Sequence, residues 1–318
     1  MCDVSKDPFR EDVRYEMKFL RFYLLCLLCL LWVAESYAQE ITPRLFWPTP
    51  KGTKVFVTGY AYSTGDLIFD YSIPLEDSES RVNTVIMAYT QTIDIWGRTS
   101  NILVDLPYAW GKSKGFLFGE PVSRDFSAFG DLSLTLNVNL KGAPTMTVED
   151  FLAFRANPQP IIGASIKVVL PTGHYNSDRL VNVGANRWAT RLKLGSVLIL
   201  KPKVLLELSA SASWFGDDDD FVVGKKSVEP IYAVETNLIK RIRPGLWASL
   251  DLTYYRGGRQ TIGGEPLRDE QRNVKLGGTI VIPFSTRHGI KVGYANGVIT
   301  RYGDDFDRFL VSYQVAFR

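Results

Sequence analysis

The chain has 318 residues, of which 46% are hydrophobic and 22% are charged, and its formal net charge is only +3. A balance this close to neutral does not indicate binding to nucleic acid or to another strongly charged partner. Beyond the N-terminal region, no run of residues is long and apolar enough for a membrane-spanning helix, so any membrane span would have to be built from strands.

The N-terminal region has the three parts of a secretory signal peptide. Basic residues precede an apolar run at residues 22–33, and Ser36 and Ala38 place small side chains at the −3 and −1 positions of a cleavage site. This order predicts a signal peptide over residues 1–38. The residues before Met17 fit no leader, so Met17 is an alternative start. The other interpretation of the apolar run is a buried core helix.

All three cysteines, Cys2, Cys26 and Cys29, fall within residues 1–38. The exported chain would then have neither a disulfide nor a thiol nucleophile. Its fold must therefore be held together by hydrogen bonding and packing.

The rest of the chain divides into a short arm and a long strand-rich region. Residues 39–53 are rich in proline and lack periodicity, so we expect a periplasmic arm there. Residues 54–318 contain segments in which apolar and polar residues alternate with period two. The twelve expected strands are 54–71, 81–95, 99–111, 129–140, 161–170, 187–200, 203–215, 230–240, 245–256, 272–283, 289–299 and 307–318.

The alternation and the even number of strands predict an all-β fold, a 12-stranded antiparallel transmembrane β-barrel of the bacterial outer-membrane type. Within 129–140, for example, Leu134 and Leu136 alternate with Ser133, Thr135 and Asn137. In such a barrel the apolar residues face lipid and the polar residues face the lumen. The soluble alternative is a periplasmic β-sandwich or a lipocalin-like barrel, but its strands usually have ~5–6 residues, fewer than most of these.

The last strand, 307–318, carries aromatic residues on one phase and ends in Phe317 and Arg318. We expect it to close the cylinder and to be the segment that the barrel-assembly machinery binds. Barrels of this kind usually end on an aromatic residue, and here that residue is the penultimate one.

The connections between strands alternate between short and long, as they do in transmembrane barrels. Short turns are expected at 96–98, 201–202, 241–244 and 284–288, and long loops at 75–80, 112–128, 171–186, 216–229, 257–271 and 301–306. The connection 141–160 breaks this rule because it is long where a short turn is expected. There Thr147 and Asp150 have the spacing of a helix cap; the connection is either a helical lid or plug, or a solvated loop.

Charged residues on the phase opposite to the apolar one are expected to line the lumen. They are Asp105, Asp131, Lys167, Arg191, Lys193, Glu207, Glu235, Asp251, Lys275, Lys291 and Arg308. Charges in so narrow a space must be hydrated or paired. The lumen is therefore either a water-filled path with weak ion preference or an interior closed by salt bridges.

Nothing in the sequence indicates catalysis, a cofactor or a metal site. The two histidines, His174 and His288, fall in connections on opposite sides of the expected barrel, although Ser177 and Asp178 lie near His174. We therefore expect no enzyme activity and no catalytic residues, with a lipid hydrolase as the least favoured alternative. The acidic run 217–220 suits either a solvated loop or contact with Ca²⁺ or lipopolysaccharide.

One segment resembles a known family. The motif residues are Pro171, Thr172, Gly173, Tyr175, Asn182, Gly184, Asn186, Arg187 and Trp188, together with Phe129, Gly130 and Asp131. They are similar to the P-T-G-x-Y, N-x-G-x-N-R-W and F-G-D elements of the outer-membrane family called "putative meta-pathway of phenol degradation". The resemblance extends from about residue 57 to the C-terminus. It implies an outer-membrane barrel through which small, hydrophobic or aromatic, molecules pass passively.

We therefore expect a barrel in the outer membrane of a Gram-negative bacterium that contacts membrane lipids and conducts a small-molecule solute. The alternative is a structural or adhesive barrel without transport.

Overall fold

The computed structural model describes residues 42–65, 75–117, 120–179, 182–222, 224–299 and 306–317. The expected signal peptide and the first residues of the arm lie outside these ranges. The strands are β1 (Lys54–Gly65), β2 (Leu75–Ile95), β3 (Arg98–Leu117), β4 (Glu120–Phe129), β5 (Ser133–Lys141), β6 (Ile161–Val169), β7 (Ala189–Lys201), β8 (Val204–Phe215), β9 (Lys226–Val228), β10 (Ile231–Arg243), β11 (Leu246–Gly257), β12 (Gln260–Ile262), β13 (Glu265–Pro266), β14 (Gln271–Pro283), β15 (His288–Ile299) and β16 (Phe306–Phe317), and the helix is α2 (Val148–Ala156).

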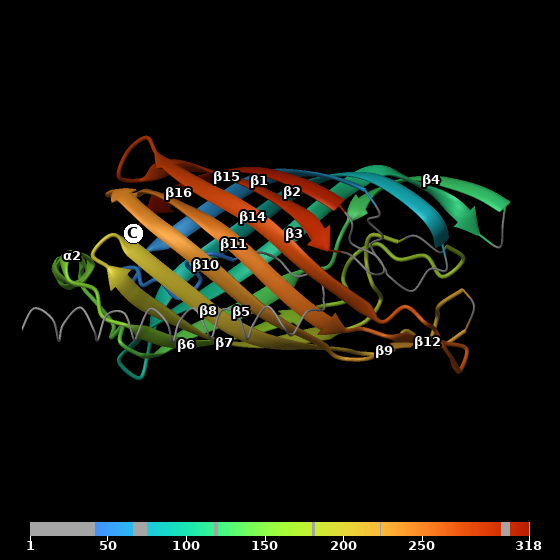
Figure 1. The fold of residues 1–318 in the computed structure, drawn as a ribbon, viewed down its shortest axis with the longest axis horizontal. Coiled ribbons are helices and arrows are strands. Elements are labelled where there is room, and N and C mark those ends of the chain that lie inside the picture. Colours follow the sequence, from blue (N-terminus) through green and yellow to red (C-terminus); the bar gives the residue numbers. More distant parts are fainter. Residues whose placement is uncertain are drawn as a thin grey trace, which may run out of the picture. The chain divides into compact units, whose positions relative to one another are not determined.

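The described strands form a closed antiparallel barrel (Figure 1). The sheet runs β2-β1-β16-β15-β14-β11-β10-β8-β7-β6-β5-β3, and an additional β2–β3 pairing closes the ring. The last strand pairs with the first, from Lys54 opposite Phe317 to Gly65 opposite Phe306. The expected 12-stranded barrel is confirmed.

Side chains alternate across the wall in the sense of a membrane barrel. Leu134 and Leu250 are 41% and 64% exposed on the outside, whereas Thr135 and Asp251 are 6% and 1% exposed on the inside. An apolar exterior around a polar interior is the reverse of a lipocalin, and it suits a lipid surround.

The turns differ at the two ends of the barrel. The β2–β3, β7–β8, β10–β11 and β14–β15 turns are short and share one end with α2 and with the end of β16 (Figure 1). We call this the short-turn end and the opposite one the long-loop end. At the β2–β3 turn, Trp96 and Gly97 both adopt positive φ, 52° and 72°, as a tight hairpin turn requires.

Two regions expected to be loops are strands at the long-loop end. The structure extends β2 and β3 beyond the barrel and adds β4, which pairs with the outer half of β3 while β5 pairs with its inner half. A small sheet of β9, β12 and β13 organises two further long loops.

The connection between β5 and β6 contains the expected cap. Thr147 accepts a hydrogen bond from the Asp150 backbone N–H, and the Asp150 side chain accepts from the Thr147 backbone N–H. This reciprocal pair starts α2, a helix of 9 residues. Among the described residues, none of the helical structure has the length and apolar character to cross a membrane.

Candidate functional site

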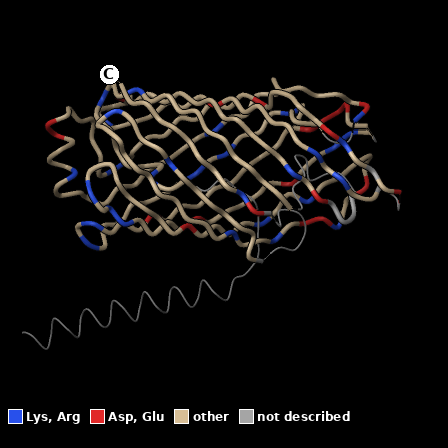
Figure 2. Tube along the Cα trace, turned by 90° about the horizontal axis from the view of Figure 1, so that it is seen from above, with Lys and Arg blue, Asp and Glu red and all other residues tan. Residues whose placement is uncertain are grey.

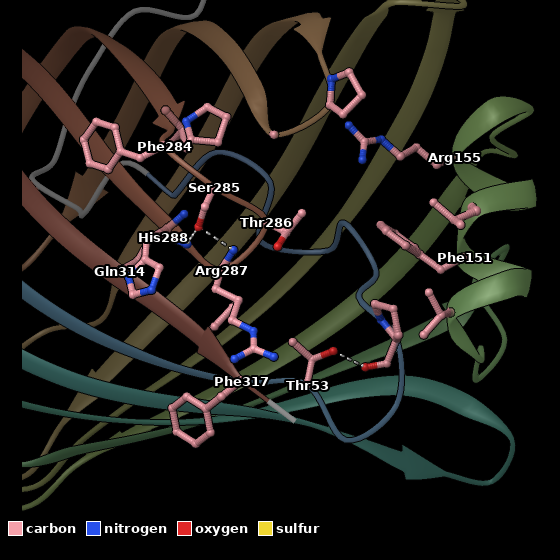
Figure 3. Close-up of a pocket in the computed structure, with 18 of the residues that line it drawn as sticks. Thr53, Phe151, Arg155, Phe284, Ser285, Thr286, Arg287, His288, Gln314 and Phe317 are labelled. Carbon is pink, nitrogen blue, oxygen red and sulfur yellow. Dashed lines mark hydrogen bonds between the residues drawn. The ribbon is translucent and has the colours of Figure 1, made fainter.

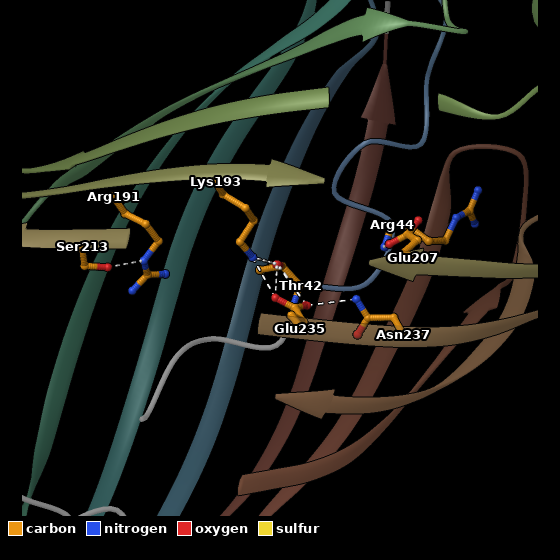
Figure 4. A network of polar contacts seen from close by, with 8 residues as sticks. All are labelled: Thr42, Arg44, Arg191, Lys193, Glu207, Ser213, Glu235 and Asn237. Carbon is orange, nitrogen blue, oxygen red and sulfur yellow. Dashed lines mark hydrogen bonds and ion pairs between the residues drawn. The ribbon is translucent and has the colours of Figure 1, made fainter. Parts of the chain in front are cut away.

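The segment before β1 lies inside the barrel instead of forming the arm expected in the periplasm (Figures 1 and 4). The Thr42 backbone N–H donates to Glu235 Oε1 at 2.9 Å. Lys193 Nζ donates to Glu235 Oε2 at 2.7 Å and to Thr42 Oγ1 at 2.9 Å. The side chains of Lys193 and Glu235 are 7% and 4% exposed, so this ion pair holds the segment in a largely dry part of the lumen.

Arg44 forms the second anchor of this segment. Its backbone N–H donates to Glu207 Oε2 at 2.6 Å. Its guanidinium lies over the rings of Trp47 and Trp247, 5.0 and 5.1 Å from their centroids. The cation therefore lies between two aromatic faces, which offset part of the cost of removing it from water.

Phe46 wedges the segment against the wall. An ideal Cβ built on Gly163 would lie 2.2 Å from a Phe46 ring carbon, and one built on Gly195 would lie 2.5 Å away. Real Cβ contacts are never this short, so both positions must be glycine for the ring to fit. The ring is only 4% exposed.

A hydrophobic cluster fills the lumen around these residues near the short-turn end. Trp47 packs against Phe154 of α2, with ring centroids 5.8 Å apart. The buried members of the cluster are Phe46, Trp47, Ala143, Met146, Ile161, Val197, Leu205, Ile239, Trp247 and Val281. We call residues 42–50 the plug segment.

The plug segment leaves little space beside it. A void of about 10 Å³ remains between Thr42, Phe46, Lys193 and Glu207. This is close to the least volume that holds one water molecule. The plug segment therefore packs closely against β7, β8 and β10 at this level.

Ten of the eleven residues expected to line the lumen lie in strands, with side chains buried or half-buried on the inner phase. The structure brings four of them together as ion pairs. Lys193 bonds Glu235 as above, and Lys167 Nζ lies 3.6 Å from Asp105 Oδ1. Arg191 donates to Ser213 Oγ at 3.1 Å, and Glu207 binds the plug segment.

The remaining charged positions are spread along the lumen without forming one cluster. Asp251 accepts from Ser249 and Thr279 at 3.0 and 3.1 Å, and Lys275 lies over the Tyr255 ring. Lys291 and Arg308 are half-buried in β15 and β16.

Several buried polar atoms of the lumen have no protein partner among the described residues. They are Thr135 Oγ1, Asn137 Oδ1, Asn237 Oδ1, Asp251 Oδ1 and Thr253 Oγ1. Buried polar atoms favour polar surroundings over apolar ones. These atoms therefore mark the interior of the barrel as polar.

Asp131 differs from the other ten because it lies in the link between β4 and β5. Its carboxylate accepts from the backbone N–H groups of Gly173 and Ala185, at 2.7 and 2.8 Å. Gly173 and Gly184 approach so closely that a Cβ on either would meet the backbone of the other within 3 Å. The Asp131 carboxylate thus clamps the long loop 170–188 to the barrel.

The other motif residues serve the same loop. Thr172 Oγ1 accepts from the Leu132 N–H at 3.0 Å. Tyr175 and Asn186 both donate to the Asp218 carboxylate, at 2.7 and 2.9 Å. Asn182 Oδ1 accepts the N–H of residue 176 within the loop. These motif residues therefore stabilise the conformation of the 170–188 loop.

Carboxylates of the acidic run 217–220 form hydrogen bonds and ion pairs with neighbouring protein groups. Asp218 is 1% exposed and accepts the bonds just described. Lys225 pairs with Asp217 and Asp219 at 2.7 and 3.2 Å, and these hydrogen bonds raise the pKa of Lys225. Among the described residues, no group of His, Cys, Asp and Glu has the arrangement of a metal site.

The two histidines do not meet. His288 Nδ1 lies 2.6 Å from Tyr313 Oη at the short-turn end. His174 lies in the 170–188 loop at the long-loop end, where its N–H donates to the Phe129 carbonyl.

The plug segment was not recognised from the sequence as part of the site. Its only sequence signal was the adjacent pair Phe46-Trp47 in an otherwise proline-rich stretch. Its partners Gly163 and Gly195 fall on the inner phase of two expected strands. A glycine inside a strand often marks a place where another part of the protein packs closely against the strand backbone.

Comparison with known proteins places this geometry among outer-membrane barrels. A family model described as "Putative MetA-pathway of phenol degradation" matches residues 63–301. The COG4313 outer membrane channel from Pseudomonas putida F1 is 22% identical, with a TM-score of 0.71 over 87% of this chain and 100% of that one. The β domain of the Bordetella autotransporter BrkA is 10% identical, with a TM-score of 0.52 over 84% of this chain and 100% of that one. Among curated proteins, none matches the chain.

Proposed function

The chain belongs to the outer-membrane barrel family described as "Putative MetA-pathway of phenol degradation", and from this premise we propose that it is a passive channel for small solutes. The observation that carries the proposal is a polar lumen that contains a segment held there without any strand pairing.

Passage requires the plug segment to move, and its contacts suit that role. It is held by the Thr42 and Arg44 bonds, by the Phe46 wedge and by Trp47. None of these contacts is a backbone pairing with a strand, so the segment leaves the lumen without breaking the barrel's ladder of backbone hydrogen bonds.

We further propose that aromatic molecules are among the solutes. The constriction is lined by Phe46, Trp47 and Trp247, and the glycine notch opposite Phe46 accepts a flat ring. An aromatic solute replaces the Phe46 ring there at little cost, because it buries a similar apolar face. The family description, which refers to phenol degradation, supports the same solute class.

The proposal sets the barrel in the outer membrane of a Gram-negative bacterium, with the short-turn end toward the periplasm. Residues 1–38 would direct export, lipids would cover the apolar wall, and the β16 strand would engage the barrel-assembly machinery. Passive passage needs no catalytic residue and no cofactor.

A structural or adhesive barrel is the second candidate. The hairpin of β2, β3 and β4 extends past the barrel at the long-loop end (Figure 1). An extension of this kind offers a surface to a partner outside the membrane, independently of any passage through the lumen.

Swelling of vesicles that contain the refolded full chain tests the proposal. We expect arabinose to enter these vesicles faster than it enters protein-free ones, and phenol to slow its uptake by sharing the path. Folded, heat-modifiable barrel that gives no faster uptake either in the parent or in the Phe46→Ala, Trp47→Ala variant, which lacks the two aromatic rings of the plug segment, would favour the structural candidate.

A further inference from the structure

A cavity of about 760 Å³ lies at the short-turn end, between α2 and the rim turns (Figure 3). Its walls come from α2, from the β10–β11 and β14–β15 turns, from the end of β16 and from residues 50 and 53. The volume is within the range of ~300–1,000 Å³ that small-molecule sites occupy. Pro50, the last residue of the plug segment, forms part of its wall, and none of the expected lumen-lining residues contributes to it.

The apolar part of this cavity is unusually open to solvent. Leu152 of α2 and Phe284 of the β14–β15 turn are 57% and 61% exposed, and both line the cavity together with Phe151 and Phe317. Large apolar side chains that face a hollow at this exposure favour an apolar ligand body.

The charged part of the cavity is entirely basic. Arg155, Arg243 and Arg287 line it, and none of its lining residues is acidic. Figure 3 shows Arg155 reaching from α2 toward the turns and Arg287 reaching from the β14–β15 turn toward Thr53. Within the part of the chain that the structure describes, these three guanidinium groups form no salt bridge with a carboxylate.

The surroundings of the cavity add to this positive field. An adjoining hollow is lined by Arg155, Lys203, Arg241 and Arg243, again without an acidic residue. Basic residues recur at this end of the barrel in Figure 2. Burial lowers the pKa of the Arg155 guanidinium, so this cation sits where an anionic partner is most favourable.

We propose that this cavity, which we call the rim pocket, binds an amphipathic carboxylate whose apolar body contacts Phe151, Leu152 and Phe284 and whose negative charge is favoured by the surrounding Arg155, Arg243 and Arg287. The guanidinium fork matches a carboxylate with two parallel hydrogen bonds, which a neutral alcohol cannot reproduce. The proposal concerns binding alone and does not depend on passage through the lumen.

Calorimetry on the refolded full chain in phosphatidylcholine nanodiscs tests it, with 2-naphthoate as the probe and 2-naphthylmethanol as its neutral counterpart. We expect one naphthoate to bind per chain. The combined variant Arg155→Gln, Arg243→Gln and Arg287→Gln should bind it at least ~10-fold more weakly, with the weak binding of naphthylmethanol unchanged.

A matched control removes two cations from the same rim but outside the rim pocket. Lys141→Gln with Lys201→Gln changes the net charge nearly as much and should leave naphthoate affinity within twofold of the parent. The shift of the unboiled band on a gel verifies that every variant is a folded barrel. A second variant, Leu152→Asp, keeps all three arginines. It should also weaken naphthoate binding, because it places an anion in the pocket.

Equal naphthoate affinity in the parent and the arginine variant would overturn the proposal, as would naphthylmethanol binding as tightly as naphthoate. Nanodiscs that contain phosphatidylglycerol separate two sources of the anion. Weaker naphthoate binding there identifies a lipid headgroup as the competing occupant, and unchanged binding identifies a free carboxylate. Both results support an anion site.

Discussion

The Phe46 ring occupies the space that a side chain on Gly163 would need. An added Cβ at Gly163 would lie 2.2 Å from the ring, although the two residues are far apart in the chain. This contact packs the plug segment against the inner face of β6. Gly163 therefore helps to hold the plug segment in place, because a larger residue would leave no room for the Phe46 ring.

Gly163→Ala should therefore loosen the plug segment. The new methyl group displaces Phe46, and overpacking of this kind costs about 1–3 kcal/mol. We expect higher single-channel conductance than in the parent and a lower urea midpoint. Gly293→Ala is the matched control, because the nearest atoms to its added Cβ lie 3.8 Å away. Similar conductance in both variants would argue against the wedge.

Lys193→Met should destabilise the barrel through Glu235. The variant leaves a buried carboxylate without its cation, and breaking a buried pair from one side costs about 3–5 kcal/mol. Equilibrium unfolding in urea measures the loss. The exposed pair of Arg81 and Glu79 provides the comparison, since Glu79→Gln should hardly change the midpoint. An equally small effect of Lys193→Met would show that the pair is solvated.

A lipid-facing charge should cost more than an inward one. Leu134→Arg places a cation on the outer face and should lower the free energy of unfolding by about 2–4 kcal/mol if the site is near the midplane. Thr135→Arg faces the polar lumen instead of lipid and should cost less. Folding yield into vesicles compares the two, and equal yields would contradict the assigned faces.

Asp131→Asn should release the 170–188 loop. The amide keeps only one carbonyl oxygen, so it cannot accept both the Gly173 and the Ala185 N–H groups as the carboxylate does. We expect trypsin to cleave after Arg179 several-fold faster than in the parent. Asp125→Asn, at an exposed pair with Lys112, should leave the cleavage rate unchanged; faster cleavage in that variant too would point to a general loosening.

The sequence predicts the barrel well because period-two alternation reports directly on which side of a strand each residue lies. Leu134 and Thr135 fall on the expected faces, and the helix cap of Thr147 and Asp150 forms where its spacing indicates.

The closure could not be predicted in the same way. Residues 42–50 have no periodicity, and their position depends on a glycine notch and on the carboxylates of Glu207 and Glu235, which come from strands far along the chain. The β4 strand was missed because Arg124 interrupts the otherwise apolar phase of Phe126 and Ala128, which the exposed Ser123, Asp125 and Ser127 alternate with.

The most direct test of the central claim is planar-bilayer recording of the parent against the double variant Phe46→Ala with Trp47→Ala. Trp96→Ala serves as the control, because that ring is 90% exposed in a turn. If residues 42–50 close a solute path, the double variant shows conductance steps several-fold larger than those of the parent and of Trp96→Ala. Identical small or absent steps in all three folded barrels would contradict a path through the lumen.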